Sequence, residues 1–149
     1  MKRLPLIVVF VLLVAVLIIL TLMSRRPPTV TVTFDNGVTV EAELADEPSE
    51  QERGLADHPM LDDAEGMLFT WQAAEPRTFW MKGVDFPIDI IWIANGKVIG
   101  YQLNTQPQPD GDLYLTYSSP GAADMVLEVA AGWVKRQGIE VGSQLTISQ

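Results

Sequence analysis

Short runs that alternate between apolar and polar residues dominate the chain from residue 29 onward. In residues 30–34 every second position is apolar and threonines lie between, and residues 38–44 repeat the alternation. A period of two is typical of a β-strand with one buried face. Between the two runs, Asp35-Asn36-Gly37 supplies residues that tolerate positive φ in a tight turn. The pattern therefore predicts a β-hairpin with one solvent-exposed face.

Further strands are predicted along the rest of the chain. Residues 88–94 are apolar on both faces apart from Asp89, which indicates a central strand, and Asn95-Gly96 turns it into a strand over 97–103. Shorter strands are predicted at 67–71, 78–82, 113–117 and 124–130, with turns at 72–77 and 118–123 and a last strand within 139–148. Eight or nine short strands without a βαβ rhythm favour a mainly β fold, a compact antiparallel sandwich or a partly closed barrel.

Two short helices interrupt this β pattern. One is predicted at 46–55, with Asp46 as cap, Ser49 and Glu52 spaced as a capping box and Gly54 at its end. The other is predicted at 132–137 and stops at Gly138.

An uninterrupted apolar run occupies residues 4–23. Twenty residues span about 30 Å as a helix, which matches the hydrocarbon core of a bilayer. We therefore expect residues 1–26 to form an N-terminal membrane anchor with a transmembrane helix at about 4–23, and residues 27–149 to form a single β domain. Cleavage as a signal peptide is the alternative, but the run is longer than usual for one and lacks an Ala-x-Ala pattern.

The flanking charges bear on orientation. Lys2 and Arg3 precede the apolar run, and Arg25 and Arg26 follow it, so the positive-inside count is nearly balanced. A short N-terminal tail ahead of such a span normally stays in the cytoplasm. The expected location is therefore the inner membrane, single-pass, with the C-terminal domain extracytoplasmic (periplasmic), or secretion if the signal is cleaved.

Residues 27–149 are strongly acidic. They carry six Lys and Arg against 19 Asp and Glu, a formal charge of −13, which argues against nucleic acid and anionic lipid headgroups as partners. The absence of cysteine excludes disulfide and zinc-thiolate chemistry, and His58 is the only histidine. The acidic loop over 57–65 does not follow the spacing of a calcium loop. We expect no cofactor and no metal, and no catalytic residue is identified.

Five residues are candidates for a binding site: Trp80, Lys82, Asp89, Tyr117 and Glu128. Trp80 and Lys82 share one face of a predicted strand, and Tyr117, Trp92 and Trp133 are expected near them. Aromatic faces beside a few polar groups suit sugars or other amphipathic ligands. The simpler interpretation is that the tryptophans belong to the core.

The two carboxylates allow more than one interpretation. Asp89 follows a proline at the start of a buried strand, where it could accept hydrogen bonds from backbone amides or pair with Lys82. Glu128 lies on another predicted strand and could form an ion pair. A glycosidase needs two such carboxyl groups at a fixed separation, so a pair of Asp89 and Glu128 is the catalytic alternative.

Several short motifs occur in a fixed order over residues 30–147: Arg53-Gly54-Leu55, Gly66-Met67-Leu68-Phe69, Phe79-Trp80-Met81-Lys82, Pro87-Ile88-Asp89, Leu127-Glu128-Val129-x-x-Gly132-Trp133 and Gly138-Ile139-x-Val141-Gly142. Together they resemble the prokaryotic family known as domain of unknown function 192. The resemblance implies a compact, mainly antiparallel β protein behind a signal or anchor, and it implies no function.

The chain departs from the family's usual pattern at two places. Ala56 and His58 stand where the family usually has Met and Arg, and Gly83 and Val84 stand where it usually has Asn and Thr. If those family positions bind something polar, this chain binds it differently or not at all.

The favoured function is a membrane-anchored, envelope-facing, non-catalytic β domain that binds an envelope glycan or a protein partner. One alternative is a carbohydrate-directed hydrolase that uses Asp89 and Glu128. Another is a structural or assembly module for an envelope protein complex.

Overall fold

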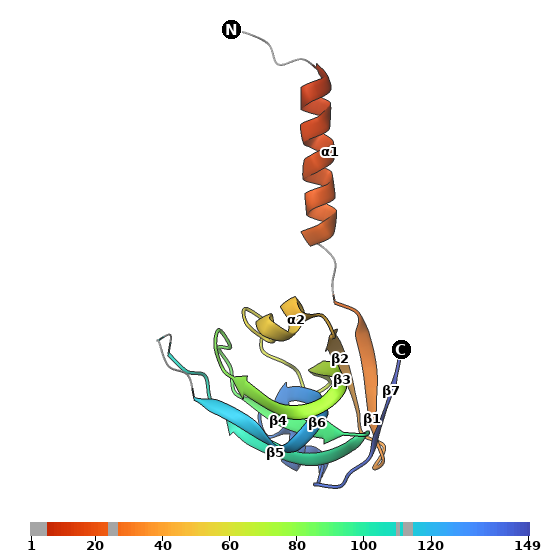
Figure 1. Cartoon of the computed structure of the whole chain (residues 1–149), viewed down its shortest axis with the longest axis vertical. Coiled ribbons are helices and arrows are strands. Elements are labelled where there is room, and N and C mark those ends of the chain that lie inside the picture. Colours follow the sequence, from red (N-terminus) through yellow and green to blue (C-terminus); the bar gives the residue numbers. More distant parts are fainter. Residues whose placement is uncertain (1–5, 24–26, 110, 112–114) are drawn as a thin grey trace.

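The computed structural model describes residues 6–23, 27–109, 111 and 115–149, and shows one helix followed by a mainly β domain (Figure 1). The elements in chain order are α1 (Leu6–Met23), β1 (Thr29–Phe34), β2 (Thr39–Ala45), α2 (Pro48–Arg53), β3 (Glu65–Trp80), β4 (Ile88–Ala94), β5 (Lys97–Thr105), β6 (Thr116–Ala130), α3 (Trp133–Gln137) and β7 (Leu145–Ser148). The short helices α2 and α3 lie where the sequence predicts them.

The strands form one curled sheet in the order β5-β4-β6-β3-β2-β1-β7. Neighbouring strands are antiparallel except β2 and β3, which pair in parallel. The two edges of the sheet meet at one end, where Lys97 of β5 bridges Gln144 and the Val98 amide donates to the Ser143 carbonyl at 2.9 Å. The mainly β prediction is therefore confirmed in its partly closed form, because the sheet is a curled half-barrel.

Two strands are much longer than predicted. β3 runs through the predicted turn at 72–77, and β6 runs through the predicted turn at 118–123. The two strands pair with each other, and the register shifts between Thr70 and Glu75 and between Pro76 and Thr78 absorb the residues that suggested a turn. Bulges of this kind let a strand continue past a proline. The predicted eight or nine strands are correspondingly seven in the described part of the chain.

The N-terminal region contains α1, which lies within the predicted span of about 4–23. Residues 1–5 and 24–26 of the predicted anchor lie outside the described residues. Among the helices of the described ranges, none is both long and apolar enough to cross a membrane. The predicted transmembrane segment is therefore not confirmed.

Two apolar cores occupy the two faces of the sheet, and β4 contributes to both, as its burial on both faces predicts. Ile91 and Ile93 belong to the core that includes Trp133 and Val134 of α3, here called the α3-side core. Ile88, Ile90 and Trp92 belong to the core that includes Leu55, just after α2, here called the α2-side core. The faces of β4 and β6 thus decide on which side of the sheet a polar residue lies.

Candidate functional site

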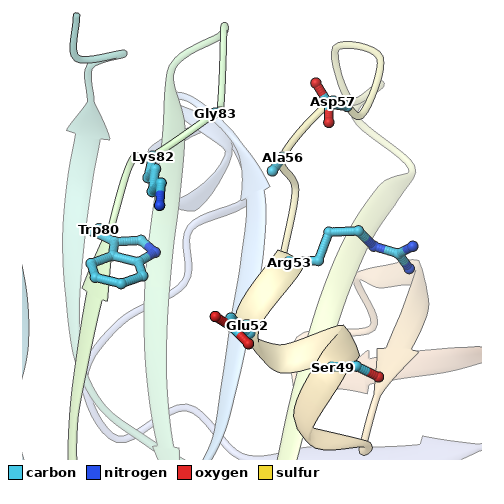
Figure 2. Close-up of a pocket in the computed structure, with 8 residues that line it drawn as sticks. All are labelled: Ser49, Glu52, Arg53, Ala56, Asp57, Trp80, Lys82 and Gly83. Atoms are coloured by element: carbon cyan, nitrogen blue, oxygen red, sulfur yellow. The ribbon is translucent and has the colours of Figure 1, made fainter. Parts of the chain in front are cut away.

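A cleft of about 500 Å³ lies between α2 with the loop that follows it and the end of β3 (Figure 2). Its lining residues are Ser49, Glu52, Arg53, Ala56, Asp57, Trp80, Lys82 and Gly83. Figure 2 shows Trp80 and Lys82 on one wall and the Glu52 carboxylate directed toward them from the other. The cleft therefore combines an aromatic surface with charges of both signs.

Trp80 and Lys82 lie on the same side of the chain at the end of β3, as predicted. The Lys82 ammonium nitrogen is 5.8 Å from the centre of the Trp80 ring, and Trp80 as a residue is 47% exposed. An ammonium this close to an indole face is attracted by the ring's negative quadrupole. The pair presents an apolar ring face and a cation to the same space.

The opposite wall is held in place by α2. The helix begins with Pro48 in its first turn and the Glu47 amide donating to the Glu50 carboxylate at 3.3 Å, one residue later than the predicted Asp46 cap. Gln51 fastens the helix to the sheet, because its amide donates to the carbonyls of Ala45 and Thr70 at 3.3 and 2.9 Å. The helix ends at Gly54, as predicted, where φ is +50°.

Glu128 lies next to this cleft, on the α2-side face of the sheet. It lines a chamber of about 30 Å³ whose lining also includes Glu52, Arg53, Trp80 and Lys82, residues that line the cleft as well. The side chain is 3% exposed, and burial raises the pKa of its carboxyl from 4.5 to about 8. Within the described residues, no hydrogen bond or ion pair reaches that carboxyl.

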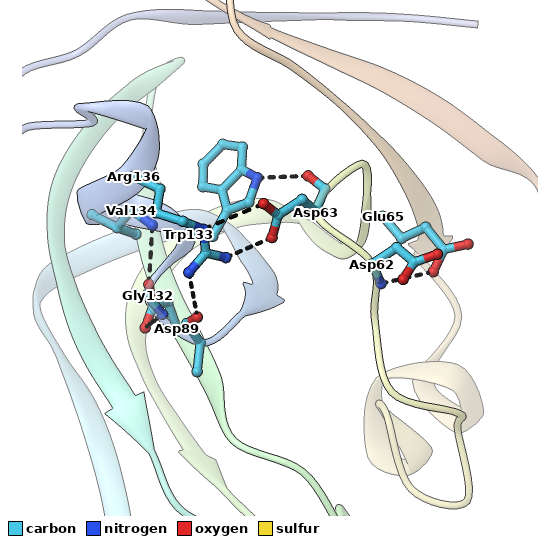
Figure 3. Close-up of polar contacts among 9 residues, drawn as sticks. Asp62, Asp63, Glu65, Asp89, Gly132, Trp133, Val134 and Arg136 are labelled. Atoms are coloured by element: carbon cyan, nitrogen blue, oxygen red, sulfur yellow. Dashed lines mark hydrogen bonds and ion pairs between the residues drawn. The ribbon is translucent and has the colours of Figure 1, made fainter.

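Asp89 is buried on the opposite face of the sheet (Figure 3). One carboxylate oxygen accepts hydrogen bonds from the amides of Asn104 at 2.8 Å and Gly132 at 3.0 Å, and the other accepts one from Val134 at 3.0 Å. Gly132 and Val134 lie at the start of α3, so Asp89 fixes the helix and the end of β5 to the sheet. Of the two predicted structural roles, the structure shows the amide contacts and not a pair with Lys82.

Asp89 and Glu128 do not form a catalytic pair. In the register of β4 and β6, Asp89 lies opposite Val129 and Glu128 lies opposite Ile90. Residues directly opposite each other in an antiparallel pair share a face, and successive residues alternate between faces. The two carboxyl groups therefore point to opposite sides of the sheet, and the predicted hydrolase arrangement is wrong.

The other predicted aromatic residues lie elsewhere. Tyr117 pairs with Phe79, the neighbour of Trp80, and packs against the α2-side core without lining the cleft or the chamber. Trp92 is buried in the same core. Trp133 lies in the α3-side core, 5.7 Å from Phe34 between ring centres, and donates to the Asp63 carbonyl at 2.8 Å. These aromatic residues therefore pack in or against the core, as the simpler interpretation expects. Trp80 differs from them because it faces the cleft.

The acidic loop forms contacts within the protein. The Asp63 carboxylate pairs with Arg136 of α3, and the Glu65 carboxylate accepts the Asp62 amide at 3.1 Å (Figure 3). Across the described ranges, no three acidic or histidine side chains converge as a metal site would require.

Sequence reasoning missed the α2 wall of the cleft. Glu52 and Arg53 belong to that wall, and the only sequence signal near them is the Arg53-Gly54-Leu55 motif of the family pattern. Ala56 and Gly83, two of the positions that depart from that pattern, line the cleft and face each other: a Cβ built on Gly83 would lie 3.0 Å from that of Ala56. Side chains larger than these would narrow the mouth of the cleft.

The fold and the cleft define a small, curled β domain with a candidate ligand site between a short helix and the end of a long strand. The chain belongs to the family described as domain of unknown function 192, an uncharacterized ACR, which matches residues 30–147. The resemblance seen in the sequence motifs is therefore confirmed, and no activity is established for the family.

Two solved structures are similar to this chain. One is a protein of unknown function from Novosphingobium aromaticivorans DSM 12444, with 32% identity, a TM-score of 0.70, and coverage of 79% of this chain and 83% of the other. The second is a protein from Sinorhizobium meliloti 1021, provisionally described as a transcription regulator, with 31% identity, a TM-score of 0.69, and coverage of 79% and 91%. No curated protein matches the chain.

Proposed function

We propose that the β domain is a non-catalytic binding domain whose cleft holds a small amphipathic ligand, a saccharide of the cell envelope. One observation carries the proposal: a half-exposed Trp80 ring and the Lys82 ammonium share a cleft of about 500 Å³ with the Glu52 carboxylate. A sugar ring has apolar C–H faces that stack on an indole and hydroxyl groups that bond to charged side chains.

We also propose that residues 1–26 anchor the protein in the inner membrane with the β domain in the periplasm. The support is the uninterrupted apolar run at 4–23, with Lys2 and Arg3 on the short N-terminal tail. A reporter enzyme fused after Ile147 would be active only outside the cytoplasm. Activity in the cytoplasm would reject this topology, and release of the fusion into the soluble periplasm would indicate cleavage instead.

Competing functions have less support. Hydrolysis by two carboxyl groups requires both at one site, and Asp89 and Glu128 lie on opposite faces. The description of the Sinorhizobium relative is not carried over, since the formal charge of −13 over residues 27–149 repels DNA. Assembly with an envelope protein would be indicated if the chain captured one partner in a stoichiometric amount, and if the Trp80→Ala variant captured the same partner equally well.

The binding test uses the full-length chain in a detergent without a sugar headgroup and soluble cell-wall glycan fragments. Saturable binding by ligand-observed NMR is expected, with roughly tenfold weaker binding for Trp80→Ala because one stacking contact is lost. Lys82→Ala should weaken binding as well, and Lys135→Ala on α3 is the matched control. Absence of saturable binding, or equal binding by Trp80→Ala and the unmodified chain, would reject the proposal.

A further inference from the structure

Glu128 is a buried polar group whose hydrogen bonds the surrounding protein leaves unmade. Its side chain is 3% exposed, and no described residue bonds to the carboxyl. Most buried polar groups in folded proteins have a hydrogen-bond partner, so a carboxyl that the protein leaves unbonded is a candidate to bond to a ligand. Glu128 lines a chamber that shares four lining residues with the cleft, so a ligand group that enters the chamber can bond to the carboxyl.

The chamber accommodates only a small group. Its volume of about 30 Å³ exceeds the roughly 10–15 Å³ that one water molecule needs, and it is far smaller than the cleft next to it. Glu52, Arg53, Trp80 and Lys82 line both spaces. A ring stacked on Trp80 in the cleft can therefore direct one substituent toward Glu128.

The charges around Glu128 come from two elements. Glu52 and Arg53 belong to α2, and Lys82 follows β3. The residues paired with Glu128 on the neighbouring strands, Met67 of β3 and Ile90 of β4, are apolar. In Figure 2 the Lys82 side chain lies on the same wall as Trp80, the Glu52 carboxylate is directed toward that wall, and the Arg53 guanidinium is directed away from it. Lys82 is therefore placed to meet an anionic group of the ligand.

The protonation state of Glu128 adds a hydrogen-bond donor near the Lys82 ammonium. Burial raises its pKa to about 8, so the carboxyl is mostly protonated at neutral pH. A protonated carboxyl donates one O–H bond, and a bond donated to a carboxylate is stronger than one donated to a neutral oxygen. A neutral hydroxyl on the ligand would gain less, and an ammonium group would be repelled by Lys82.

We propose that Glu128 donates a hydrogen bond to a ligand carboxylate, so that the cleft selects an acidic saccharide, a uronic acid, over a neutral one. This inference rests on the proposed binding function and names its ligand class. Trp80 stacks on the sugar ring, Lys82 supplies positive charge, and Glu128 recognises the carboxylate. Deprotonation of Glu128 replaces the donor by a second anion, so binding weakens as the pH rises.

The test compares three sugars that share one ring: D-glucuronate, D-glucose and D-glucosamine. Their affinities for the full-length chain are measured by NMR titration at pH 6 and pH 9. At pH 6, glucuronate should bind roughly tenfold more tightly than glucose because of the charge-assisted bond. The preference should fall severalfold at pH 9. Equal affinity for glucuronate and glucose, or stronger binding of glucosamine, would overturn the inference while leaving the binding function standing.

Glu128→Gln separates this role from other causes of pH dependence. The glutamine amide has nearly the same shape and keeps a donor at every pH, so glucuronate binding should persist at pH 9 and become independent of pH. Glu140→Gln, which makes the same chemical change in an exposed turn, should retain the pH dependence of the unmodified chain. Unchanged pH dependence in Glu128→Gln would overturn the inference. Failure of all three sugars to bind at either pH would reject the proposed function and this inference with it.

Discussion

Asp89 and Glu128 are buried carboxyl residues on adjacent strands, and they have opposite surroundings. Asp89 accepts hydrogen bonds from three backbone amides, and these bonds hold α3 and the end of β5 against the sheet. Glu128 faces the chamber next to the cleft with no bond from any described residue. Burial alone therefore does not distinguish a structural carboxylate from a functional one. The hydrogen bonds that the fold already provides make that distinction, and the predictions below test it.

The largest expected effect is on the Asp89 side. Asp89→Ala leaves three amides without an acceptor, and hydrogen bonds to charged groups are worth roughly 1.5–3 kcal/mol each. We expect a loss of about 5 kcal/mol in the free energy of unfolding by urea titration, which is enough to unfold a marginally stable domain. Asp89→Asn retains one acceptor oxygen and should lose less. A loss below about 1 kcal/mol for the alanine variant would contradict the structural role.

The second effect is a pH dependence from Glu128. The pKa of Glu128 is about 8 in the folded protein, above the ordinary value of 4.5 that it has in the unfolded chain. The stability that the protonated carboxyl contributes is therefore fully present below pH 4.5 and is lost as the pH rises toward 8. Each pH unit in this window corresponds to about 1.4 kcal/mol, giving on the order of 4 kcal/mol between pH 5 and pH 8.

Glu128→Gln should remove this component. The variant should match the unmodified chain at pH 5 and be more stable at pH 8, as measured by urea unfolding at both values. Glu140→Gln controls for the loss of one negative charge from an acidic domain. Parallel pH profiles for the unmodified chain and Glu128→Gln would argue that Glu128 is ionised in the folded state.

The smallest effect on stability is expected at Lys82. Its side chain is exposed and contacts the Trp80 ring at 5.8 Å, an interaction worth about 0.5–1 kcal/mol at an exposed site. Lys82→Ala should therefore change the unfolding free energy by less than about 1 kcal/mol while weakening ligand binding. A large loss in the free energy of unfolding would show that Lys82, like Asp89, holds the fold together.

The sequence predicted those parts of the fold that depend on local chemistry. The hairpin turns at Gly37 and at Asn95-Gly96 adopt positive φ, as their residue types require, and α3 ends at Gly138. The turns predicted around Pro76 and Pro120 did not form, because β3 and β6 pair with each other through those residues. The parallel pairing of β2 with β3 is equally non-local, and no short pattern in the sequence signals it.

The candidate site was predicted in part for the same reason. Trp80 and Lys82 are two residues apart at and just beyond the end of β3, so a local pattern was enough to place them together. The separation of Asp89 from Glu128 depends on the register of β4 against β6, which lies beyond any short motif. Glu52 and Arg53 lie at the cleft because α2 is held against the sheet, and the bond from Gln51 to Thr70 joins distant parts of the chain.

The pKa of the Glu128 carboxyl in the folded protein is the quantity that tests the proposed role of Glu128 most directly. Titration of the side-chain carboxyl carbons of glutamate by ¹³C NMR, with Glu128→Gln assigning the resonance, would measure it. We predict a pKa of about 8, and a further rise when glucuronate binds, because the ligand's carboxylate stabilises the protonated form. A pKa near the ordinary value of 4.5, unchanged by glucuronate, would contradict the account.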